Sequence, residues 1–486
     1  MKGEKDTTSL SLGRETAFAM GAKFLLALVG FAGVVLFARV LGVDGVGKYY
    51  FLLAIAKLTV QVPGGFSNAI KKRVSEVDVD PGEYFGFGVL TVAVYTVVLL
   101  GAAVVGHPFL RDQIGPFAFA LGAVGIVGSL GLFSLSNRLY AGIGNPGASF
   151  WADSVRSVFT LAFQVAFLLM GMRVLGLMYG LVLATLVTAA GVVVAANVRP
   201  RLPTRETAAS VWEFARWSVP NSLTQNLYMR LDVLILGVVV GKSAVGLYEP
   251  ALRLTVPAGF IAISISDSLT VKASGLTSID EDVGDDLMNS LSYTALFAIP
   301  ILFGALAMPE ALMGIVFGPD YAAGATALVL LAVFQLFNTY RMPFDNVVDG
   351  MDRPDIRFRV SLFTLAINAP LAVFLGLEYG LTGVVVATIV AEAARTATYL
   401  VVAYRLFDRV MLPRTLLEQF VSGLLMFGVV YALNDAVAID GPFVLAAVVG
   451  VGGVVYFAAL VALSSHFRLT VRSVLRDLGL GDVVGV

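Results

Sequence analysis

Two neighbouring lines of polar side chains run along an otherwise apolar stretch, residues 217–240. Ser222, Asn226 and Arg230 recur every four residues and therefore share one face of a helix. The adjacent line follows a four-three-four spacing: Asn221, Gln225, Tyr228 and Asp232. Arg230 lies about eleven residues before Gly241, or ~16 Å along a helix, which puts it near the middle of a membrane span. A guanidinium at that depth can hold a phosphate through two parallel hydrogen bonds.

A charged side chain at membrane depth costs ~2.5–3.5 kcal/mol on insertion scales, so Arg230 and Asp232 need an explanation. In a functional explanation, Arg230 binds an anionic substrate in a wet cavity and Asp232 exchanges a proton or Na⁺. In a structural explanation, either group pairs with a charge on a neighbouring helix. We take Arg230, Asn226 and Ser222 as substrate-binding candidates and Asp232 as an ion-coupling candidate, with the structural explanation open for both charges.

Two lysines also fall inside apolar runs. Lys57 lies about eight residues from the end of its run and has little opportunity to reach water. Lys23 is closer to an end, where its ammonium can extend to the lipid headgroups. We add both lysines to the substrate-binding candidates.

A second group of buried charges lies later in the chain. Glu392 and Arg395 are three residues apart on one helix face, so Glu392 is either an ion-coupling group or half of an intrahelical pair. Arg395 joins the substrate-binding candidates. Arg341 and Asp345, four residues apart, are interpreted as structural groups near the membrane interface.

The residue types also narrow the possible chemistry. The chain has no cysteine, and its two histidines, His107 and His466, are far apart. Thiolate or histidine metal sites and histidine-based catalysis therefore have almost nothing to use. The phosphate-binding pattern G-x-x-x-x-G-K-[ST] is missing from the sequence. We expect no catalytic residue, no metal, no cofactor and no nucleic-acid partner.

These residues must be positioned by membrane-spanning helices. Of 486 residues, 58% are hydrophobic and 14% charged, and the mean hydropathy is +0.86. The apolar residues come in runs of about 18 to 25, the length that crosses ~30 Å of hydrocarbon. The sequence predicts an all-α membrane protein of about fourteen spans. They are 16–38, 49–70, 85–106, 116–137, 154–171, 174–197, 217–240, 254–272, 287–308, 322–346, 359–376, 380–402, 415–434 and 443–464.

Lysine and arginine are concentrated on one side of these spans. The segments assigned to the other side hold few of them: Arg39, Lys48, Arg111, Arg173, Lys242 and Arg253. This bias predicts a multi-pass protein of the cell membrane with both termini in the cytoplasm. Arg138 and Arg156 fall among the cytoplasmic cations in this assignment.

Two further cytoplasmic features are expected. The acidic stretch 280–286 is interpreted as solvated surface. Arg468, Arg472 and Arg476 share one face of a C-terminal helix whose opposite face is apolar. That pattern predicts an amphipathic helix that binds the anionic lipids of the inner leaflet.

The chain contains an internal repeat. LGVDGVGKYY (41–50) returns as VGKSAVGLYE (240–249), GIGNP (142–146) as GMDRP (350–354), and GLVLAT (180–185) as GVVVAT (383–388). The three matches come in the same order at nearly the same offset. Because six spans separate the copies, both halves enter the membrane with the same orientation.

The repeat predicts three parts. An N-lobe of spans 1–6 covers 1–205, a C-lobe of spans 7–12 covers 206–410, and 411–486 holds two extra spans and the amphipathic helix. The halves are expected to be two parallel six-helix lobes related by an axis along the membrane normal, with a cavity between them. The stretch 199–217 is interpreted as an interfacial amphipathic linker.

Several segments resemble the polysaccharide-transporter, or Wzx-type, flippases of the multidrug/oligosaccharidyl-lipid/polysaccharide exporter superfamily. They are ARVLGVDGVGKYY (38–50), VPNSLTQNLYMRLDVLILG (219–237), VGLYEPALRL (245–254) and IVFGPDYAAGA (315–325). The resemblance implies transport of a lipid-linked (polyprenyl-phosphate) oligosaccharide from the inner to the outer leaflet for glycan biosynthesis. It also implies alternating access driven by a gradient of H⁺ or Na⁺.

Two other functions remain open. A multidrug or organic-cation antiporter of the same superfamily predicts an acidic cavity, whereas the charges within the spans here are slightly cationic. A membrane-embedded glycan polymerase or glycosyltransferase predicts a large outer loop with clustered acids or histidines. The outer loops expected here are about four to thirteen residues long and carry no such cluster.

Overall fold

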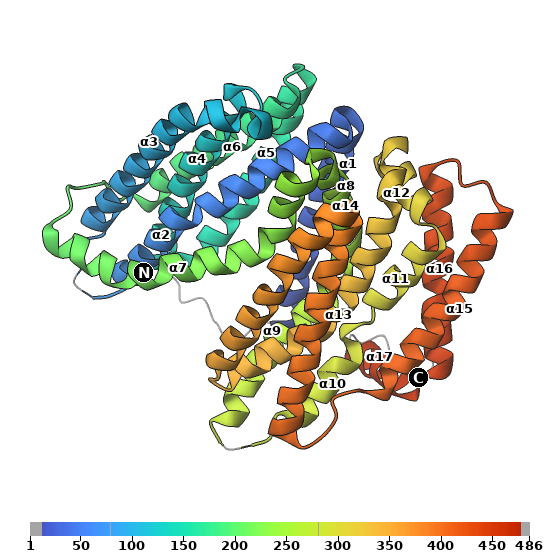
Figure 1. The fold of residues 1–486 in the computed structure, drawn as a ribbon. Coiled ribbons are helices and arrows are strands. Elements are labelled where there is room, and N and C mark those ends of the chain that lie inside the picture. The colour runs from blue at the N-terminus through green and yellow to red at the C-terminus, as the bar shows by residue number, and fades with distance from the viewer. Residues whose placement is uncertain (1–11, 78, 280, 478–486) are drawn as a thin grey trace. The chain divides into compact units, whose positions relative to one another are not determined.

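The computed structural model describes residues 12–77, 79–279 and 281–477, and every regular element among them is helical (Figure 1). The first part of the chain forms α1 (Leu12–Thr59), α2 (Gln61–Val74), α3 (Pro81–Ile114), α4 (Phe117–Gly142), α5 (Pro146–Leu169), α6 (Arg173–Ala196) and α7 (Arg205–Ile235). The π-helical turn η2 (Leu236–Val240) then leads to α8 (Lys242–Thr255), η3 (Val256–Gly259), α9 (Phe260–Thr277), α10 (Gly284–Thr294), α11 (Ala298–Ala307), α12 (Pro309–Phe317) and η4 (Pro319–Gly324). The last elements are α13 (Ala325–Gly350), α14 (Pro354–Phe407), α15 (Arg414–Ala436), α16 (Pro442–Leu463) and α17 (Ser465–Asp477).

Twelve helical stretches of the described chain are long and apolar enough to cross a membrane, and two of them are broken by a glycine. The 54 residues of α14 would extend ~81 Å if straight, far more than one crossing needs. The backbone of α14 leaves the helical conformation at Gly380 (φ 59°, ψ −135°) and folds back there. The evidence is the short distance across this point: a Cβ on Gly383 would lie 1.9 Å from the carbonyl oxygen of Leu375. In a straight helix these residues would be ~12 Å apart. Dividing α14 at Gly380 and α1 at Gly42 turns twelve stretches into fourteen segments, which confirms the all-α multi-span prediction.

The internal repeat is also present in the backbone angles. Gly42 (φ 69°, ψ 178°) and Gly241 (φ 130°, ψ 168°) both end a span with positive φ and extended ψ. A side chain is strained in that region, so both copies of the motif need glycine there. Asn145 and Arg353, which precede the prolines of the second motif, have the same angles, φ −118° and ψ 52°.

The glycines that end α4 and α13 make equivalent close approaches. A Cβ on Gly142 would lie 2.8 Å from the carbonyl oxygen of Lys71 in α2, and one on Gly350 would lie 2.6 Å from that of Thr270 in α9. In each half, therefore, the fourth span of the repeat packs at its end directly on the backbone of the second. Glycine permits that contact because it has no side chain.

A further repeated element connects loops in each half. Asp80 accepts a hydrogen bond from the backbone N–H of Gly82, and Asp282 accepts one from Gly284, each at 2.9 Å. An arginine from the loop after the sixth span of the repeat pairs with each aspartate: Arg201 with Asp80 at 2.8 Å, and Arg409 with Asp282 at 3.3 Å. Asp282 and Asp285 are largely exposed, as the interpretation of 280–286 as solvated surface predicts, and both also pair with Arg409 of the segment that follows α14.

The chain divides into two compact units, one up to Leu234 and one from Ile235. Helix α7 begins at Arg205, so most of the expected linker 199–217 is part of a helix. It is held in the first unit by Arg73, which donates to the carbonyl oxygen of Ser210 and pairs with Glu213 at 3.0 Å. The three-part division at 205 and 410 stays a prediction.

Each unit has its own apolar core. In the first, Ile70 of α2, Leu135 of α4 and Val211 of α7 are fully buried together. In the second, Leu287 of α10 and Tyr399 of α14 belong to one buried cluster, and the Tyr399 ring stacks on Phe344 of α13 at 6.1 Å. These clusters fix the helices that carry the charged residues described below.

The close packing at Gly383 gives a testable prediction. Gly383→Ala should lower the free energy of unfolding by about 1–3 kcal/mol, because its Cβ would meet backbone rather than a movable side chain. The matched control is Gly453→Ala in α16, where nothing lies within 4 Å of the added carbon and alanine favours the helix. Thermal unfolding of the purified full chain in detergent measures both. Equal midpoints for the two variants would contradict the fold-back at Gly380.

Candidate functional site

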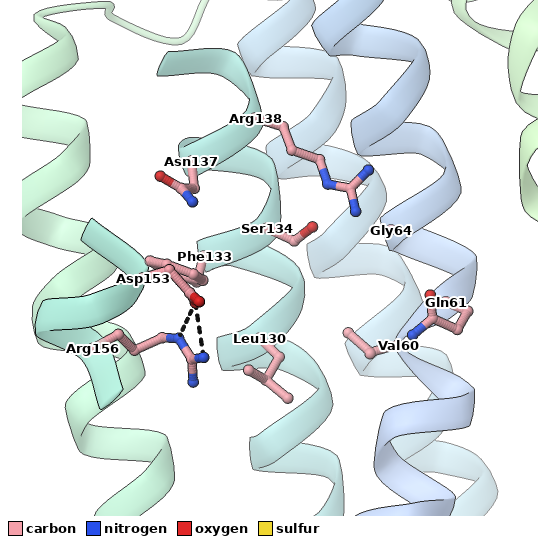
Figure 2. Close-up of a pocket in the computed structure, with 10 residues that line it drawn as sticks. All are labelled: Val60, Gln61, Gly64, Leu130, Phe133, Ser134, Asn137, Arg138, Asp153 and Arg156. Carbon is pink, nitrogen blue, oxygen red and sulfur yellow. Dashed lines mark hydrogen bonds and ion pairs between the residues drawn. The ribbon is translucent and has the colours of Figure 1, made fainter. Parts of the chain in front are cut away.

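The first unit contains a cavity of about 280 Å³ between the α1–α2 junction and helices α4 and α5 (Figure 2). Its lining combines six polar side chains with apolar residues: Val60, Gln61, Gly64, Leu130, Phe133, Ser134, Asn137, Arg138, Asp153 and Arg156. Pro63 and Gly64 lie in the first turn of α2, where the Lys57 carbonyl accepts a hydrogen bond from the Gln61 side chain at 2.9 Å. The cavity is therefore formed by the second, fourth and fifth spans.

Arg156 is held in place by two contacts on one side of the cavity. Its Nε and Nη2 donate to Asp153 at 3.1 and 2.9 Å, and its guanidinium lies 5.1 Å from the centre of the Phe133 ring. Its assignment to the cytoplasmic side stays a prediction. Helix α5 begins at Pro146 rather than near 154, because proline starts a helix readily at its first position, and Arg156 is thus ten residues inside it.

Arg138 lies on α4 and extends toward the α2 ribbon in Figure 2. Helix α4 continues to Gly142, beyond the predicted end of the span at 137, and the assignment of Arg138 to the cytoplasmic side stays a prediction. No residue of the described chain forms a hydrogen bond or ion pair with the Arg138 guanidinium. The neighbouring Asn137 Oδ1 is likewise buried without a hydrogen-bond partner among the described residues. With Arg138, Arg156 and Asp153, the cavity carries a net charge of +1.

The candidates on the seventh span lie together on α7. Asn226 donates to the carbonyl oxygen of Ser222 at 3.0 Å, which confirms that they follow one helix face. Arg230 and Asp232 are half-buried near the end of α7, where the helix passes into η2. Their roles in binding and coupling stay predictions.

The two lysine candidates are both in α1. Lys57 is half-buried, and it lies one turn before the α1–α2 junction that borders the cavity. The side chain of Lys23 lies outside the residues whose side chains the structure describes.

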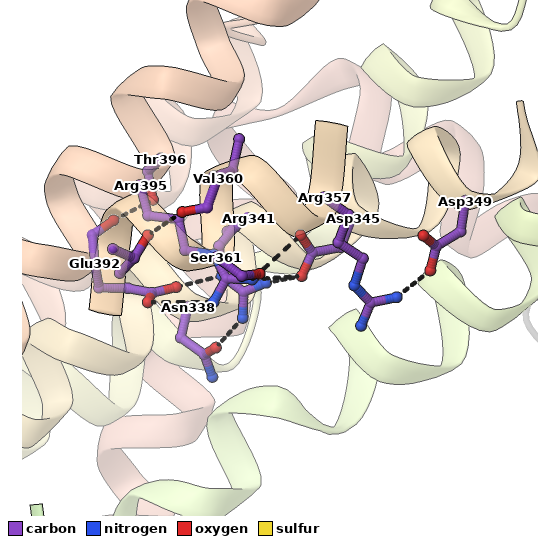
Figure 3. Close-up of polar contacts among 11 residues, drawn as sticks. Asn338, Arg341, Asp345, Asp349, Arg357, Val360, Ser361, Glu392, Arg395 and Thr396 are labelled. Atoms are coloured by element: carbon purple, nitrogen blue, oxygen red, sulfur yellow. Dashed lines mark hydrogen bonds and ion pairs between the residues drawn. The ribbon is translucent and has the colours of Figure 1, made fainter. Parts of the chain in front are cut away.

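The second unit joins four charges that the sequence presented as two separate pairs (Figure 3). Arg341 of α13 donates to Asp345 on its own helix and to Glu392 on α14. Arg395 of α14 lies 3.3 Å from Asp345 and 4.0 Å from Glu392. Asn338 accepts a further hydrogen bond from Arg341 at 2.8 Å.

This four-charge network is buried and balanced. Glu392 is 1% exposed. The two arginines and two carboxylates of the network sum to zero charge. Both Arg341 and Asp345 are buried inside the unit, in keeping with the structural role expected of them, and their depth in the membrane stays a prediction. A balanced cluster between α13 and α14 ties the tenth span to the twelfth.

Metal binding has little support in this arrangement. Across 12–77, 79–279 and 281–477, no group of three or more His, Cys, Asp or Glu side chains could hold a metal ion. The polar groups of the cavity are instead hydrogen-bond donors and acceptors around a cation, a set suited to an anionic ligand.

Comparison with known proteins gives a family, two relatives and a solved structure that are similar to this chain. The family model for polysaccharide biosynthesis proteins matches residues 36–325. The probable flippase AglR of Haloferax volcanii is 28% identical over 96% of this chain and 99% of its own, and the probable low-salt glycan biosynthesis flippase Agl15 of the same organism is 24% identical over 89% and 90%. Among solved structures, the inward closed form of the lipid II flippase MurJ matches 95% of this chain and 99% of its own with a TM-score of 0.75 and 16% identity.

The four-charge network predicts a specific pattern of stabilities. Arg341→Met should lower the free energy of unfolding by about 3–5 kcal/mol, because it leaves two buried carboxylates facing one arginine. The double variant Arg341→Met/Glu392→Leu restores one positive and one negative charge, so it should recover part of that loss. Thermal unfolding of the single and double variants measures the coupling. Additive losses would show that the two side chains do not interact.

Proposed function

The chain belongs to the polysaccharide biosynthesis protein family, and on that basis we propose that it moves a lipid-linked oligosaccharide across the cell membrane. The match over 36–325, together with nearly full-length similarity to flippases, carries this proposal. The substrate would be a polyprenyl-phosphate glycan transferred from the inner to the outer leaflet. Both termini would lie in the cytoplasm, as the distribution of lysine and arginine predicts.

The intramembrane cations support an anionic substrate. Arg230, Arg138 and Arg156 all lie on helices of the first unit, and Arg138 and Arg156 line a cavity of positive net charge. In the proposed mechanism Arg230 holds the phosphate midway through translocation, with Asn226 and Ser222 as neighbouring polar groups. Lys57, Lys23 and Arg395 are further candidates for contacts with the substrate.

A multidrug or organic-cation antiporter is the alternative closest in fold class. It requires a cavity that attracts cations, and the cavity of the first unit carries a net positive charge instead. A glycan polymerase or glycosyltransferase requires a set of catalytic side chains. The polar groups grouped here are suited to binding and translocation.

Energy coupling would come from an ion gradient. We propose Asp232 and Glu392 as the carboxylates that exchange H⁺ or Na⁺ during the cycle. Protonation of Glu392 would change the helix packing, because it would weaken the ion pair with Arg341 that joins α14 to α13. Alternating access requires such a change between two arrangements of packed helices.

The test is reconstitution of the full chain in proteoliposomes that contain a polyprenyl-diphosphate oligosaccharide. An imposed gradient of H⁺ or Na⁺ should raise the rate at which the glycan becomes accessible to an external glycosidase, and collapse of all gradients should abolish the increase. Asp232→Asn or Glu392→Gln should remove the response to the gradient. Flipping that is unchanged without any gradient would refute the coupling, and no flipping under any gradient would refute the function.

Arg230 gives a separate prediction. Arg230→Lys keeps the charge but loses the planar fork, so it should reduce flipping in part, whereas Arg230→Ala should abolish it. Both variants should stay folded at the temperature of the flipping assay, which thermal unfolding of the purified variants checks. A structural arginine would behave differently, since its removal would strand a buried acid and cost about 3–5 kcal/mol. An early-unfolding Ala variant, or one that flips normally, contradicts the substrate role.

A further inference from the structure

The cavity of the first unit contains an unsatisfied cation beside an unsatisfied acceptor. Arg138 has no ion pair or hydrogen bond with the described part of the chain, and the Asn137 Oδ1 next to it is buried without a hydrogen-bond partner there. The carboxylate among the lining residues, Asp153, already accepts two hydrogen bonds from Arg156. A buried acceptor such as Asn137 Oδ1 is costly unless something binds it, and the half-buried Arg138 guanidinium beside it is available to the same ligand.

We propose that this cavity is a docking subsite for the phosphate-linked sugar at the head of the lipid carrier. Arg138 binds the phosphate oxygens, and Asn137 binds a sugar hydroxyl. The assignment rests on the proposed transport of a lipid-linked glycan and adds a place and residues for its recognition, distinct from the contact proposed for Arg230.

The ligand chemistry follows from the two unmet groups. A guanidinium without a carboxylate requires an anion, and phosphate matches its donors with two parallel bonds. The Asn137 side-chain amide offers an acceptor as well as a donor, which a hydroxyl group can satisfy in either amide orientation. Ser134, which follows the same face of α4 one turn earlier, adds a second hydroxyl-binding group. A sugar phosphate supplies both the anion and the hydroxyl groups.

The volume limits what can enter. Pockets for whole drug-sized ligands measure about 300–1,000 Å³. The cavity here, at about 280 Å³, accommodates a single phosphate-linked sugar rather than a complete oligosaccharide. The remaining sugars and the lipid would extend outside it.

The depth of Arg138 suggests when the subsite is used. Arg138 is four residues from the end of α4 at Gly142, or ~6 Å along the helix, on the side predicted to be cytoplasmic. The Arg230 guanidinium is near mid-span by residue count. The subsite around Arg138 therefore binds the head group as it enters from the inner leaflet, before the phosphate passes to Arg230.

Binding to the purified full chain in zwitterionic nanodiscs tests this subsite. The probes are a polyprenyl-phosphate-linked hexose, free hexose-1-phosphate and uncharged polyprenol. The unmodified protein should bind the lipid-linked hexose more tightly than the free sugar phosphate and should not bind polyprenol. Arg138→Gln should weaken binding of the lipid-linked probe about tenfold or more, and Arg138→Lys should weaken it less.

The control is Arg205→Gln, which removes an exposed arginine at the start of α7 and should leave the affinity unchanged. Equal affinities for Arg138→Gln and the unmodified protein would overturn the subsite. Equal binding of free hexose-1-phosphate and the lipid-linked probe would overturn the assignment to a lipid carrier, as would binding of polyprenol.

Thermal unfolding without ligand separates a binding role from a structural one. Arg138→Leu should unfold at the same temperature as the unmodified protein or at a higher one, because it removes a half-buried charge that has no described partner. A clear fall in the unfolding temperature would identify Arg138 as a structural group and contradict the proposal.

A flipping assay with the same samples distinguishes failure of the Arg138 subsite from failure of the proposed transport function. If the unmodified protein flips the substrate and Arg138→Gln binds it normally, the subsite is wrong and the transport function stands. If Arg138 is needed for binding but the unmodified protein never flips the substrate, the transport function is wrong and the subsite stands.

Discussion

A charge inside a membrane protein must have a partner, and this constraint separates the two kinds of charged site in the chain. In the second unit, Arg341, Arg395, Asp345 and Glu392 neutralise one another between α13 and α14. In the first unit, Arg156 has Asp153, whereas Arg138 faces a cavity and contacts no charge of the described chain. Paired charges stabilise helix packing, and a charge left unpaired in a cavity is available to a ligand.

The positions of these charges depend on a duplicated backbone. Gly42 and Gly241 both end spans with positive φ and extended ψ, and Gly142 and Gly350 bring the fourth span of each half onto the backbone of the second. Because Arg138 lies one turn before Gly142, that close contact holds its helix against α2, on which the other wall of the cavity lies. The small residues at helix contacts thus determine where the polar side chains meet.

Much of the fold could be predicted from sequence, because long apolar runs and the recurrence of glycine motifs depend on local properties of the chain. The site was predicted less well. Arg138 and Arg156 were counted among the cytoplasmic cations at the ends of their spans, since hydropathy ends a span where charges begin, while the helices continue through Gly142 and from Pro146. Hydropathy cannot show that a charged residue lies within a helix and faces a cavity. The joining of Arg341 to Glu392, 51 residues apart, likewise depends on how α13 packs on α14. The repeated Asp-x-Gly at 80–82 and 282–284 was a sequence signal for the loop contacts.

The most direct test of the account is a cryo-EM map of the full chain in nanodiscs with a polyprenyl-phosphate-linked sugar. The account predicts phosphate density within hydrogen-bond distance of the Arg138 guanidinium and sugar density beside Asn137, with the four charges of the second unit still paired to one another. Density for the head group only at other sites, with Arg138 paired to a carboxylate of the protein, would contradict it.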